Sequence, residues 1–413
     1  MRRVVVTGLG AVTPLGNSLA AYSEALFKGV SGANAITHFD ASAFKTRFAC
    51  EVKNFDPGEA LDKKEARRMD LFTQYALVAT HEAVHNSGLT SDQLASDRAA
   101  VIWGSGVGGL KSLETEIVDF AIHNYQPRFS PFLIVRMIAD IAPGYISIKY
   151  GCQGINYSTV SACASSNHAM INAFDYIRLN KADIAITGGS EAAVIATGIG
   201  GFSNMKALSE RNDDYHTASR PFDKDRDGFV LGEGGGALIF EEYEHARARG
   251  AHIYAEVVGT GASADAYHIT APHPEGHGAA LVMRLALKEA GLSTKQIDYI
   301  NVHGTSTPLG DVAELRAIGK VFGEDAYRLN ISSTKSMTGH LLGASGAIEA
   351  IAGLMAIKHQ MIPPTINHFT DDPEIDPKLN LTFNEPQKRA VDYVLSNTFG
   401  FGGHNSSIIF KRV

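Results

Sequence analysis

One of the three cysteines stands where a nucleophile is expected. Cys163 follows a strand-like run, Tyr157–Val160, and precedes a helical pattern that begins through small residues. The free N–H groups and positive dipole at the start of a helix stabilise a thiolate and lower the pKa of the thiol. Cys50 and Cys152 have no comparable setting. The sequence therefore predicts a reactive thiol at Cys163, with a buried, inert cysteine as the alternative.

Two histidines also follow strand-like segments. His303 comes directly after Asp298–Val302, and His340 follows a second strand-and-turn segment, Ser332–Gly339. Catalytic groups in α/β sheets gather outside the carboxyl ends of strands. A thiolate with two imidazoles supplies a nucleophile, acid/base groups and hydrogen-bond donors for an oxyanion. We therefore predict nucleophilic catalysis by these three residues.

A competing zinc motif lies earlier in the chain. His81, Glu82 and His85 match H-E-x-x-H on a helical pattern, in which the two histidines share a metal and the glutamate activates its water. The longer signature fails, because its third histidine falls at Ser91, and Gly88 is explained equally well as a helix C-cap. A zinc hydrolase remains the weaker hypothesis.

A glycine-rich segment follows the strand-like run Ala99–Gly104. Gly104–Gly109 satisfies G-x-G-x-x-G, a pattern that cradles a pyrophosphate in dinucleotide-binding folds. No acidic residue closes a second strand at the expected spacing. We therefore expect these glycines to permit close backbone approach beside a pocket.

Length and composition limit the class of protein. A chain of 413 residues exceeds the usual limit of about 250–300 for one core, so two core-forming units are expected. Hydrophobic residues make up 45% and charged residues 20%, which excludes disorder as the main state. The net charge of −7, without a run of Lys or Arg, argues against a nucleic-acid partner.

The cysteine usage and the apolar segments indicate a cytoplasmic protein. The three cysteines form no C-x-x-C pair, which argues against a disulfide scaffold and a thiolate zinc site. The apolar start of the chain is too short for a signal peptide. Charged residues and glycines interrupt the most apolar region, Ala182–Phe202, so we expect no membrane insertion.

Short apolar runs bounded by glycine alternate with helical patterns. The predicted strands are Arg3–Gly8, Ala99–Gly104, Asp183–Gly188, Gly236–Phe240, Ile253–Gly259, Asp298–Val302, Val394–Asn397 and Ser406–Lys411. The predicted helices between them include Met69–Ser87, His168–Leu179, Gly278–Ala290 and Ala347–His359. This alternation predicts α/β layers with a largely parallel sheet.

The sequence contains a weak internal repeat. A strand ending in Gly8-Leu9-Gly10-Ala11 opens the first part, and one ending in Gly259-Thr260-Gly261-Ala262 opens the second. The strand, turn and helix around Cys163 are repeated around His340. We therefore predict two pseudo-symmetric halves, residues 1–250 with the cysteine and residues 251–413 with the catalytic histidines.

Several long motifs together resemble one family nearly end to end. They are VVVTGLGAVTPLG, SACASSNHA, ASRPFDKDRDGFVLGEGGG, NVHGTSTPLGD, SSTKSMTGHLLGASG and SNTFGFGGHN. In this order they resemble the elongating β-ketoacyl-acyl-carrier-protein synthases, condensing enzymes of fatty acid synthesis. The resemblance implies an α/β, thiolase-like duplicated fold layered α-β-α-β-α, a homodimer, no cofactor, and acyl-carrier protein as partner.

The resemblance assigns roles to the site residues. Cys163 takes the acyl chain as a thioester, and His303 and His340 assist decarboxylation of the malonyl group. Lys335 supports the histidines, and the backbone N–H groups of Cys163 and Phe401 form the oxyanion hole. Phe401 is also expected to swing as a gate. The remaining substrate contacts implied are Thr305 and Thr307 for pantetheine, and Gly106 and Val107 for the acyl tail.

Two further sets come from the same resemblance. A basic patch is expected to dock the acidic carrier protein; its candidates are Lys63, Lys64, Arg67, Arg68, Arg128 and Lys206. No catalytic metal is implied, but a structural monovalent cation near Asn301, Glu349 and Ser396 is found in some members.

The same motifs separate this chain from related enzymes. The loop Gly400–His404 lacks the second cysteine of degradative thiolases, and His340 stands where starter-unit synthases carry asparagine. Non-catalytic partner subunits lack the cysteine, although a partner subunit that merely retains the fold stays an alternative. His404 replaces a common threonine, and Ala164-Ser165 replaces Thr-Ser. Polyketide and aryl-polyene synthases therefore remain alternatives with the same chemistry.

Overall fold

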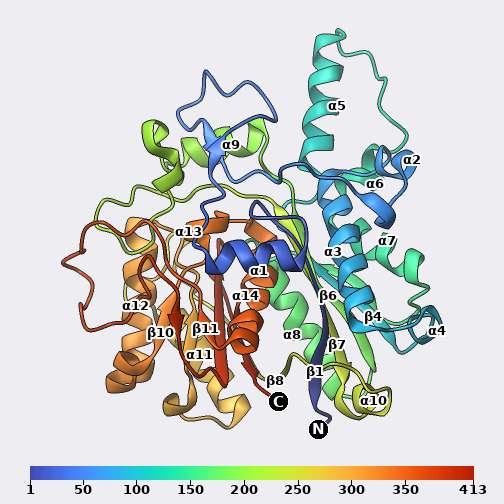
Figure 1. The fold of residues 1–413 in the computed structure, drawn as a ribbon. Helices are drawn as coiled ribbons and strands as arrows, with labels where there is room; N and C mark the ends of the chain where they lie inside the picture. The colour runs from blue at the N-terminus through green and yellow to red at the C-terminus, as the bar shows by residue number, and fades with distance from the viewer.

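The computed structural model describes all 413 residues and contains one ten-stranded sheet (Figure 1). Its strands from the first part of the chain are β1 (Val4–Val12), β4 (Ala99–Gly104), β5 (Asn156–Thr159), β6 (Ile184–Glu191) and β7 (Gly234–Glu242). Their order across the sheet is β5-β4-β6-β7-β1.

The second part of the chain supplies the other five strands in the same order. They are β8 (Ala255–Ala264), β9 (Tyr299–Asn301), β10 (Asn330–Ser332), β13 (Tyr393–Gly400) and β14 (His404–Lys411). Their spatial order is β10-β9-β13-β14-β8. If the five strands of each set are numbered in chain order, both sets have the same spatial order, 3-2-4-5-1. The two sets meet where β1 pairs antiparallel with β8 over Val4–Val6.

The sheet is mixed, and the prediction of a largely parallel sheet is wrong. Only β4 with β5 and β6, and β9 with β10 and β13, run parallel; the other five pairings are antiparallel. A strand buried on both faces is apolar whatever its direction, so an apolar run reports burial and not orientation. The short turn between β13 and β14 makes a hairpin, which only antiparallel strands can form.

Helices cover both outer faces of the sheet and fill the space between its halves. Helices α8 (Ser165–Arg178) and α14 (Ser345–His359) contact each other and strands of both halves. Helices α3 (Leu71–Ser87) and α7 (Ile141–Tyr150) pack on the first half, and α11 (His277–Ala290) packs on the second. The layered α-β-α-β-α arrangement is therefore present (Figure 1).

Shorter elements complete the chain. The other helices are α1 (Leu19–Phe27), α2 (Lys63–Ala66), α4 (Ser91–Leu94), α5 (Leu110–Ile122), α6 (Leu133–Met137), α9 (Ala196–Asn204), α10 (Tyr243–Ala248), α12 (Pro308–Phe322) and α13 (Lys335–Thr338). Two small sheets pair β2 (Asn34–Ala35) with β3 (Phe48–Ala49), and β11 (Met361–Ile362) with β12 (Gln387–Lys388). Helix α5 projects from the body and buries no residue (Figure 1). No helix combines the length and apolar character that crossing a membrane requires.

Every predicted strand and helix is present, with ends that differ by a few residues. Helix α8 begins at Ser165 and not at the predicted His168, which brings its first turn next to Cys163. Helix α3 ends at Gly88 in the left-handed conformation with φ of 68°, so the C-cap explanation of Gly88 is confirmed.

The largest core cluster joins the two halves of the sheet around α8 and α14. It contains Ile102 and Leu238 from the first half, Val394 and Ile408 from the second, and most of α14 between them. This packing holds the first turns of α8 and α14 in a fixed relative position. Cys163 lies just before α8, and His340 lies just before α14.

Candidate active site

Cys163 lies in a tight turn between β5 and α8, two residues before the first helical residue. Ala162 has a φ of 50°, in the left-handed region that residues other than glycine rarely adopt. The Ser165 hydroxyl holds this turn: it donates to the Ala162 carbonyl at 2.7 Å and accepts from the Ser161 N–H at 3.0 Å. The sulfur is thus fixed at the carboxyl end of β5, as predicted.

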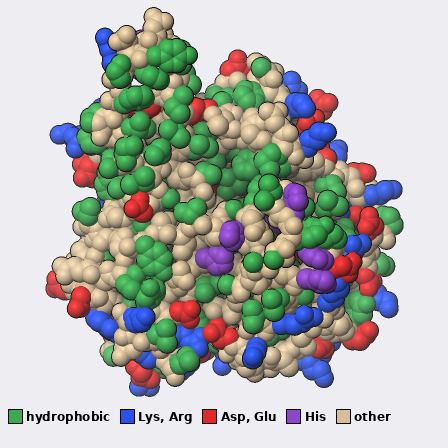
Figure 2. Space-filling model, turned by 180° about the vertical axis from the view of Figure 1, so that it is seen from behind, with side chains coloured by type: hydrophobic (Ala, Val, Ile, Leu, Met, Phe, Trp, Pro, Cys, Tyr) green, Lys and Arg blue, Asp and Glu red, His purple; other side chains and the backbone are tan.

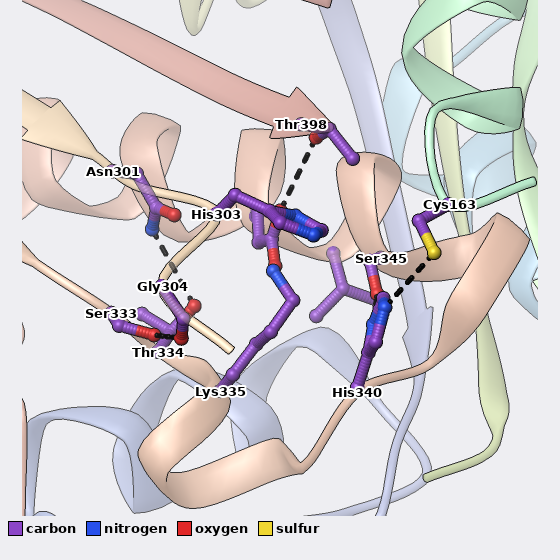
Figure 3. Close-up of polar contacts among 12 residues, drawn as sticks. Cys163, Asn301, His303, Gly304, Ser333, Thr334, Lys335, His340, Ser345 and Thr398 are labelled. Carbon is purple, nitrogen blue, oxygen red and sulfur yellow. Dashed lines mark hydrogen bonds and ion pairs between the residues drawn. The ribbon is translucent and has the colours of Figure 1, made fainter. Parts of the chain in front are cut away.

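Both predicted histidines converge on this sulfur (Figure 3). His340 Nε2 lies 3.0 Å from Cys163 Sγ, and His340 Nδ1 lies 2.9 Å from the Ser345 hydroxyl. The His303 ring meets the His340 ring edge-on, with centroids 5.3 Å apart. One ligating atom of each of the three residues lies within 4.8 Å of the others.

The two imidazoles are neutral at neutral pH. Burial lowers the pKa of His303 and of His340 well below the ordinary value, and the charge of Lys335 acts in the same direction. A neutral imidazole carries one N–H donor and one nitrogen acceptor. Each ring can therefore either take a proton or donate a hydrogen bond to a developing oxyanion.

The prediction of a lowered thiol pKa at Cys163 is wrong. Burial raises the pKa of this thiol to about 12, although the charge of Lys335 and the hydrogen bond from the Phe401 N–H act in the opposite direction. The loss of hydration outweighs the start of the helix. The resting thiol keeps its proton, and His340 Nε2 at 3.0 Å is placed to accept it on attack.

Lys335 forms a buried ion pair with Glu349 beside the histidines. Thr398 donates to the other oxygen of Glu349 at 3.4 Å. Burial raises the pKa of Glu349 to about 7, and Lys335 acts against that rise. Lys335 lies at the start of α13, in the turn that follows β10, so the fold brings its ammonium to the histidines as predicted (Figure 3).

Glu314 positions the His303 segment and was missed in the sequence. Its carboxylate accepts the His303 N–H at 3.0 Å and the Gly304 N–H at 2.8 Å. Burial raises the pKa of Glu314 to about 7. The available signal was an acidic residue among apolar neighbours on α12, eleven residues after His303.

The turn between β13 and β14 lies directly on the nucleophile turn. A side-chain carbon at Gly400 would stand 2.8 Å from the Ser161 carbonyl and 3.1 Å from the Cys163 nitrogen, so only glycine fits. The Phe401 N–H faces the Cys163 sulfur and acts to lower the pKa of its thiol. Two backbone N–H groups, those of Cys163 and Phe401, therefore stand beside the reactive atom.

A cavity of about 410 Å³ opens onto the three central residues. Its apolar wall includes Phe202, Phe229, Leu342 and Phe401. Thr305 and Thr307 also line it, with their hydroxyl oxygens 3.0 Å apart. The cavity can therefore hold a long substrate whose thioester lies at Cys163. Its apolar part would contact the phenylalanines and Leu342, and its hydrogen-bonding groups would contact the two threonines.

Gly106 and Val107 lie beside the nucleophile turn but do not line this cavity. Their N–H groups donate to the buried Glu191 at 2.7 and 3.2 Å, and the Val107 side chain is 42% exposed. A side-chain carbon at Gly104 would lie 2.4 Å from the Ser166 nitrogen. The glycine-rich segment therefore serves close packing, as expected.

The predicted docking residues are exposed but belong to separate elements. Lys63, Lys64, Arg67 and Arg68 lie on or just after α2, whereas Arg128 lies between α5 and α6. Lys206 follows α9 and lines the cavity mouth. Arg68 lies over the ring of Phe132 at 5.5 Å, which ties the α2 segment to the start of α6.

The zinc motif on α3 is committed to structural contacts. Both oxygens of Glu82 accept backbone N–H groups, from Leu19 at 2.8 Å and from Ala11 at 2.9 Å. His85 is exposed on the outer face of α3. Glu82 therefore holds the backbone of β1 and of the start of α1. Its oxygens accept these N–H groups and are not directed at a metal between His81 and His85.

We expect chelators to leave the enzyme's activity unchanged and the exposed variant His85→Ala to behave as the parent. Glu82→Gln should destabilise the fold by about 1–3 kcal/mol, because one carboxylate oxygen beside the backbone N–H groups becomes an NH₂ donor and the negative charge is lost. Denaturant unfolding measures this loss. Tight zinc, with a hydrolase activity that Glu82→Gln destroys, would contradict this structural role.

Comparisons with known proteins agree with this geometry. The family described as "Beta-ketoacyl synthase, N-terminal domain" matches residues 1–246, and "Beta-ketoacyl synthase, C-terminal domain" matches residues 254–369. The chain is 50% identical over 413 residues to "3-oxoacyl-[acyl-carrier-protein] synthase 2" of Synechocystis sp., covering 100% of this chain and 98% of the relative.

Solved structures show the same similarity. A β-ketoacyl synthase from Burkholderia phymatum superposes with a TM-score of 0.93 at 36% identity, over 100% of both chains. A ketosynthase of a type II polyketide synthase, solved with its acyl-carrier protein, superposes with a TM-score of 0.90 at 32% identity, over 100% of this chain and 99% of that chain. The fold is thiolase-like, and the chain belongs to the β-ketoacyl synthase family of condensing enzymes.

Proposed function

We propose that this protein is an elongating 3-oxoacyl-acyl-carrier-protein synthase. It joins an acyl chain held on Cys163 to the two-carbon unit of malonyl-carrier protein. The observation that carries the proposal is the 3.0 Å contact between Cys163 Sγ and His340 Nε2, with His303 against the same ring, at a cavity large enough for an acyl thioester. The relative of Synechocystis sp. named above supports the choice of substrates.

The first half-reaction transfers the acyl group. The Cys163 sulfur attacks the thioester carbonyl of acyl-carrier protein while its proton passes to His340. The oxyanion that forms accepts hydrogen bonds from the backbone N–H groups of Cys163 and Phe401. Collapse of this intermediate breaks the bond to the pantetheine sulfur, which leaves as a thiol with the proton.

The second half-reaction makes the carbon nucleophile. Loss of CO₂ from the malonyl group leaves an enolate, whose oxygen accepts hydrogen bonds from the neutral rings of His303 and His340. The enolate carbon then attacks the acyl thioester, and the Cys163 sulfur leaves and regains a proton. Burial, aided by the charge of Lys335 beside both rings, keeps the pKa of each histidine low and the rings neutral. Thr305 and Thr307 are placed to hold the pantetheine arm.

The Phe401 turn is proposed as the gate for this sequence of substrates. Its ring lines the cavity beside Cys163, and Gly402 and Gly403 have φ values of 86° and 74°, which glycine adopts without strain. A ring that covers the thiol until the acyl chain arrives enforces acylation before malonyl binding. Phe401→Ala should weaken this order more than it weakens folding.

The basic segment Lys63, Lys64, Arg67 and Arg68 is proposed to dock the acidic carrier protein, together with Arg128 and Lys206. We expect reversal of charge at Lys64 and Arg67 to raise KM for carrier-bound substrate while kcat stays within about twofold. High salt should raise KM of the parent protein in the same way, because it screens the same charges. Steady-state kinetics measure both constants.

Lys388→Glu is the matched control for this docking surface. Lys388 is exposed on β12, beside β11 at the C-terminal end of α14, whereas the site lies at the N-terminal end of that helix. It should change neither constant. A KM that stays the same in the Lys64 and Arg67 variant removes the segment from the interface.

A homodimer is proposed through the free edge of the sheet. β5 is an outermost strand, and next to it Val160 is 63% exposed and Ile148 on α7 is 80% exposed. The projecting helix α5 carries Ile117 and Ile122, both more than half exposed, and Figure 2 shows hydrophobic side chains gathered on this projection. Two β5 edges can pair about a two-fold axis, and analytical ultracentrifugation measures the resulting mass.

The acyl tail is proposed to extend past Gly106 and Val107, toward this same edge. We expect Val107→Phe to shorten the longest accepted acyl chain while short chains react normally, because added volume in a packed tunnel is resisted. Extension assays with acyl-carrier proteins of graded length measure the change. Equal relative rates for long and short chains would place the tunnel elsewhere.

A structural monovalent cation is proposed beside the Lys335–Glu349 pair. Asn301 Oδ1 and Ser396 Oγ are buried without a hydrogen-bond partner, and the two residues are direct neighbours on β9 and β13. Unpaired buried oxygens are costly, and oxygen ligands suit hard cations. Such an ion would stabilise the negative charge of Glu349. Melting temperature in potassium against tetramethylammonium salts tests it.

A polyketide ketosynthase is the second candidate, because a type II polyketide ketosynthase is among the similar solved structures. Extension assays separate the two: reduction of each product before the next round marks fatty acid elongation, whereas acceptance of unreduced poly-β-keto chains marks polyketide synthesis. If the protein were a non-catalytic partner subunit, Cys163 would not be acylated. Acyl substrate would then also fail to protect Cys163 from alkylation by a thiol reagent.

A further inference from the structure

We propose that Cys163, His303 and His340 form a binding site for a soft divalent cation, Zn²⁺ above all, and that its occupation reversibly inhibits the enzyme. The residues supply one sulfur and two imidazole nitrogens. Zinc sites with three protein ligands keep a fourth position open for water. Binding stands on this geometry alone; only the inhibition rests on the proposed function.

The distances are close to those that a tetrahedral ion requires. With bonds of about 2.3 Å to sulfur and 2.0–2.1 Å to nitrogen, the ligand atoms of such a site lie about 3.3–3.6 Å apart. Here Cys163 Sγ and His340 Nε2 are 3.0 Å apart, and all three ligating atoms lie within 4.8 Å of one another. The separation of Cys163 Sγ and His340 Nε2 must grow by about 0.5 Å, and no separation in the set must shrink by more than about 1.5 Å, to reach that geometry.

The ligands are already held in orientation. The second ring nitrogen of His340 lies 2.9 Å from the Ser345 hydroxyl, so Nε2 stays directed at the sulfur. The backbone of His303 is fixed through its N–H bond to Glu314. A partner on the second ring nitrogen, such as Ser345 on His340, strengthens metal sites, whereas His303 Nδ1 is buried without a hydrogen-bond partner.

The surroundings admit an ion and supply a fourth ligand. All three residues line the 410 Å³ cavity that opens to solvent, so an ion reaches them without unfolding. The charge of Lys335, which acts on both rings, is partly offset by its ion pair with Glu349. Water or a small anion from the cavity completes the coordination.

Coordination removes the groups that the reaction needs. The cation displaces the Cys163 thiol proton to solvent and holds the sulfur as a metal-bound thiolate, while both imidazoles lose the nitrogens that face the substrate. Zinc and acyl thioester therefore compete for the same sulfur. An enzyme whose Cys163 is already acylated lacks the sulfur ligand and should resist inhibition.

Co²⁺ titration of the full-length protein tests the site without turnover. We expect one equivalent to bind with a sulfur-to-cobalt charge-transfer band, and Zn²⁺ to displace it. Loss of an outer partner typically weakens metal binding by 10–100-fold, so loss of the ligand in Cys163→Ser should weaken it by more than about 100-fold and remove the band. Circular dichroism checks that this variant is folded.

The double variant His81→Ala/His85→Ala is the matched control, since it removes the other histidine pair without touching the cavity. It should keep the band, the stoichiometry and the inhibition by Zn²⁺, and a chelator should restore activity in both proteins. Cobalt bound without a sulfur band, equal affinity in Cys163→Ser, or loss of binding in the double variant would each overturn the proposal. None of these results bears on condensation in metal-free buffer, so the proposed function is judged separately.

Discussion

Cys163→Ser is expected to lower acyl transfer by on the order of 10⁴-fold or more, because a hydroxyl at neutral pH is a far weaker nucleophile than sulfur. The serine oxygen would lie at the same turn, beside the same His340 nitrogen and the same Phe401 N–H, so the loss isolates the chemistry of the attacking atom. Transfer of a radiolabelled acyl group from carrier protein to enzyme measures it directly.

A second substitution at the same position separates the two half-reactions. Cys163→Gln should also accept no acyl group but should retain decarboxylation of malonyl-carrier protein, since that step depends on His303 and His340. Carbon dioxide release measures the retained activity, and thermal melting shows whether each variant is folded. Condensation that survives in the serine variant would remove Cys163 from its role.

His303→Ala and His340→Ala are each expected to slow decarboxylation by about 10²–10³-fold, the usual effect of losing one donor to a developing oxyanion. The reason lies in their neutral state: burial and Lys335 keep both rings uncharged, so each can donate a hydrogen bond to the enolate oxygen. Release of CO₂ from malonyl-carrier protein in single turnovers measures the change.

Acylation of Cys163 should fall less than decarboxylation in both histidine variants. His340→Ala should slow acylation more than His303→Ala, because only His340 contacts the sulfur, at 3.0 Å. His85→Ala, an exposed histidine on α3, is the control and should leave both rates unchanged. An equal fall of acylation and decarboxylation in both variants would contradict the proposed division of roles.

The position of the three central residues could be predicted because each follows a strand-like run. Catalytic groups in α/β folds gather outside the carboxyl ends of strands, so Cys163, His303 and His340 were expected in one site. The strand order that joins them was not: β5 lies at one end of the sheet and β9 and β10 at the other. The repeated strand, turn and helix around Cys163 and His340 also appeared in the sequence, since its small residues and glycines mark tight turns.

The supporting carboxylates could not be predicted in the same way. Glu314 clamps the His303 backbone, Glu191 clamps Gly106 and Val107, and Glu82 clamps Leu19, all through contacts distant in sequence. Apart from the apolar neighbours of Glu314 on α12, nothing local distinguishes these residues from surface acids. The predicted direction of the thiol pKa was wrong for a related reason: Cys163 is buried by Phe229, Leu342 and the β13–β14 turn, which no pattern around residue 163 reveals.

The equivalent placement of Cys163 and His340 bears on how such a site arose. Cys163 lies between β5, the third strand of its half, and α8. His340 lies between β10, the third strand of the other half, and α14, after the short helix α13. Two identical ancestral copies would have placed the same side chain at both positions, giving either two thiols or two imidazoles. A mixed pair therefore records divergence after the gene was doubled and joined, with one copy specialised to bond the acyl group and the other to handle charge. After that divergence each half depends on the other, because the thiol of one half and the imidazole of the other are both needed for catalysis.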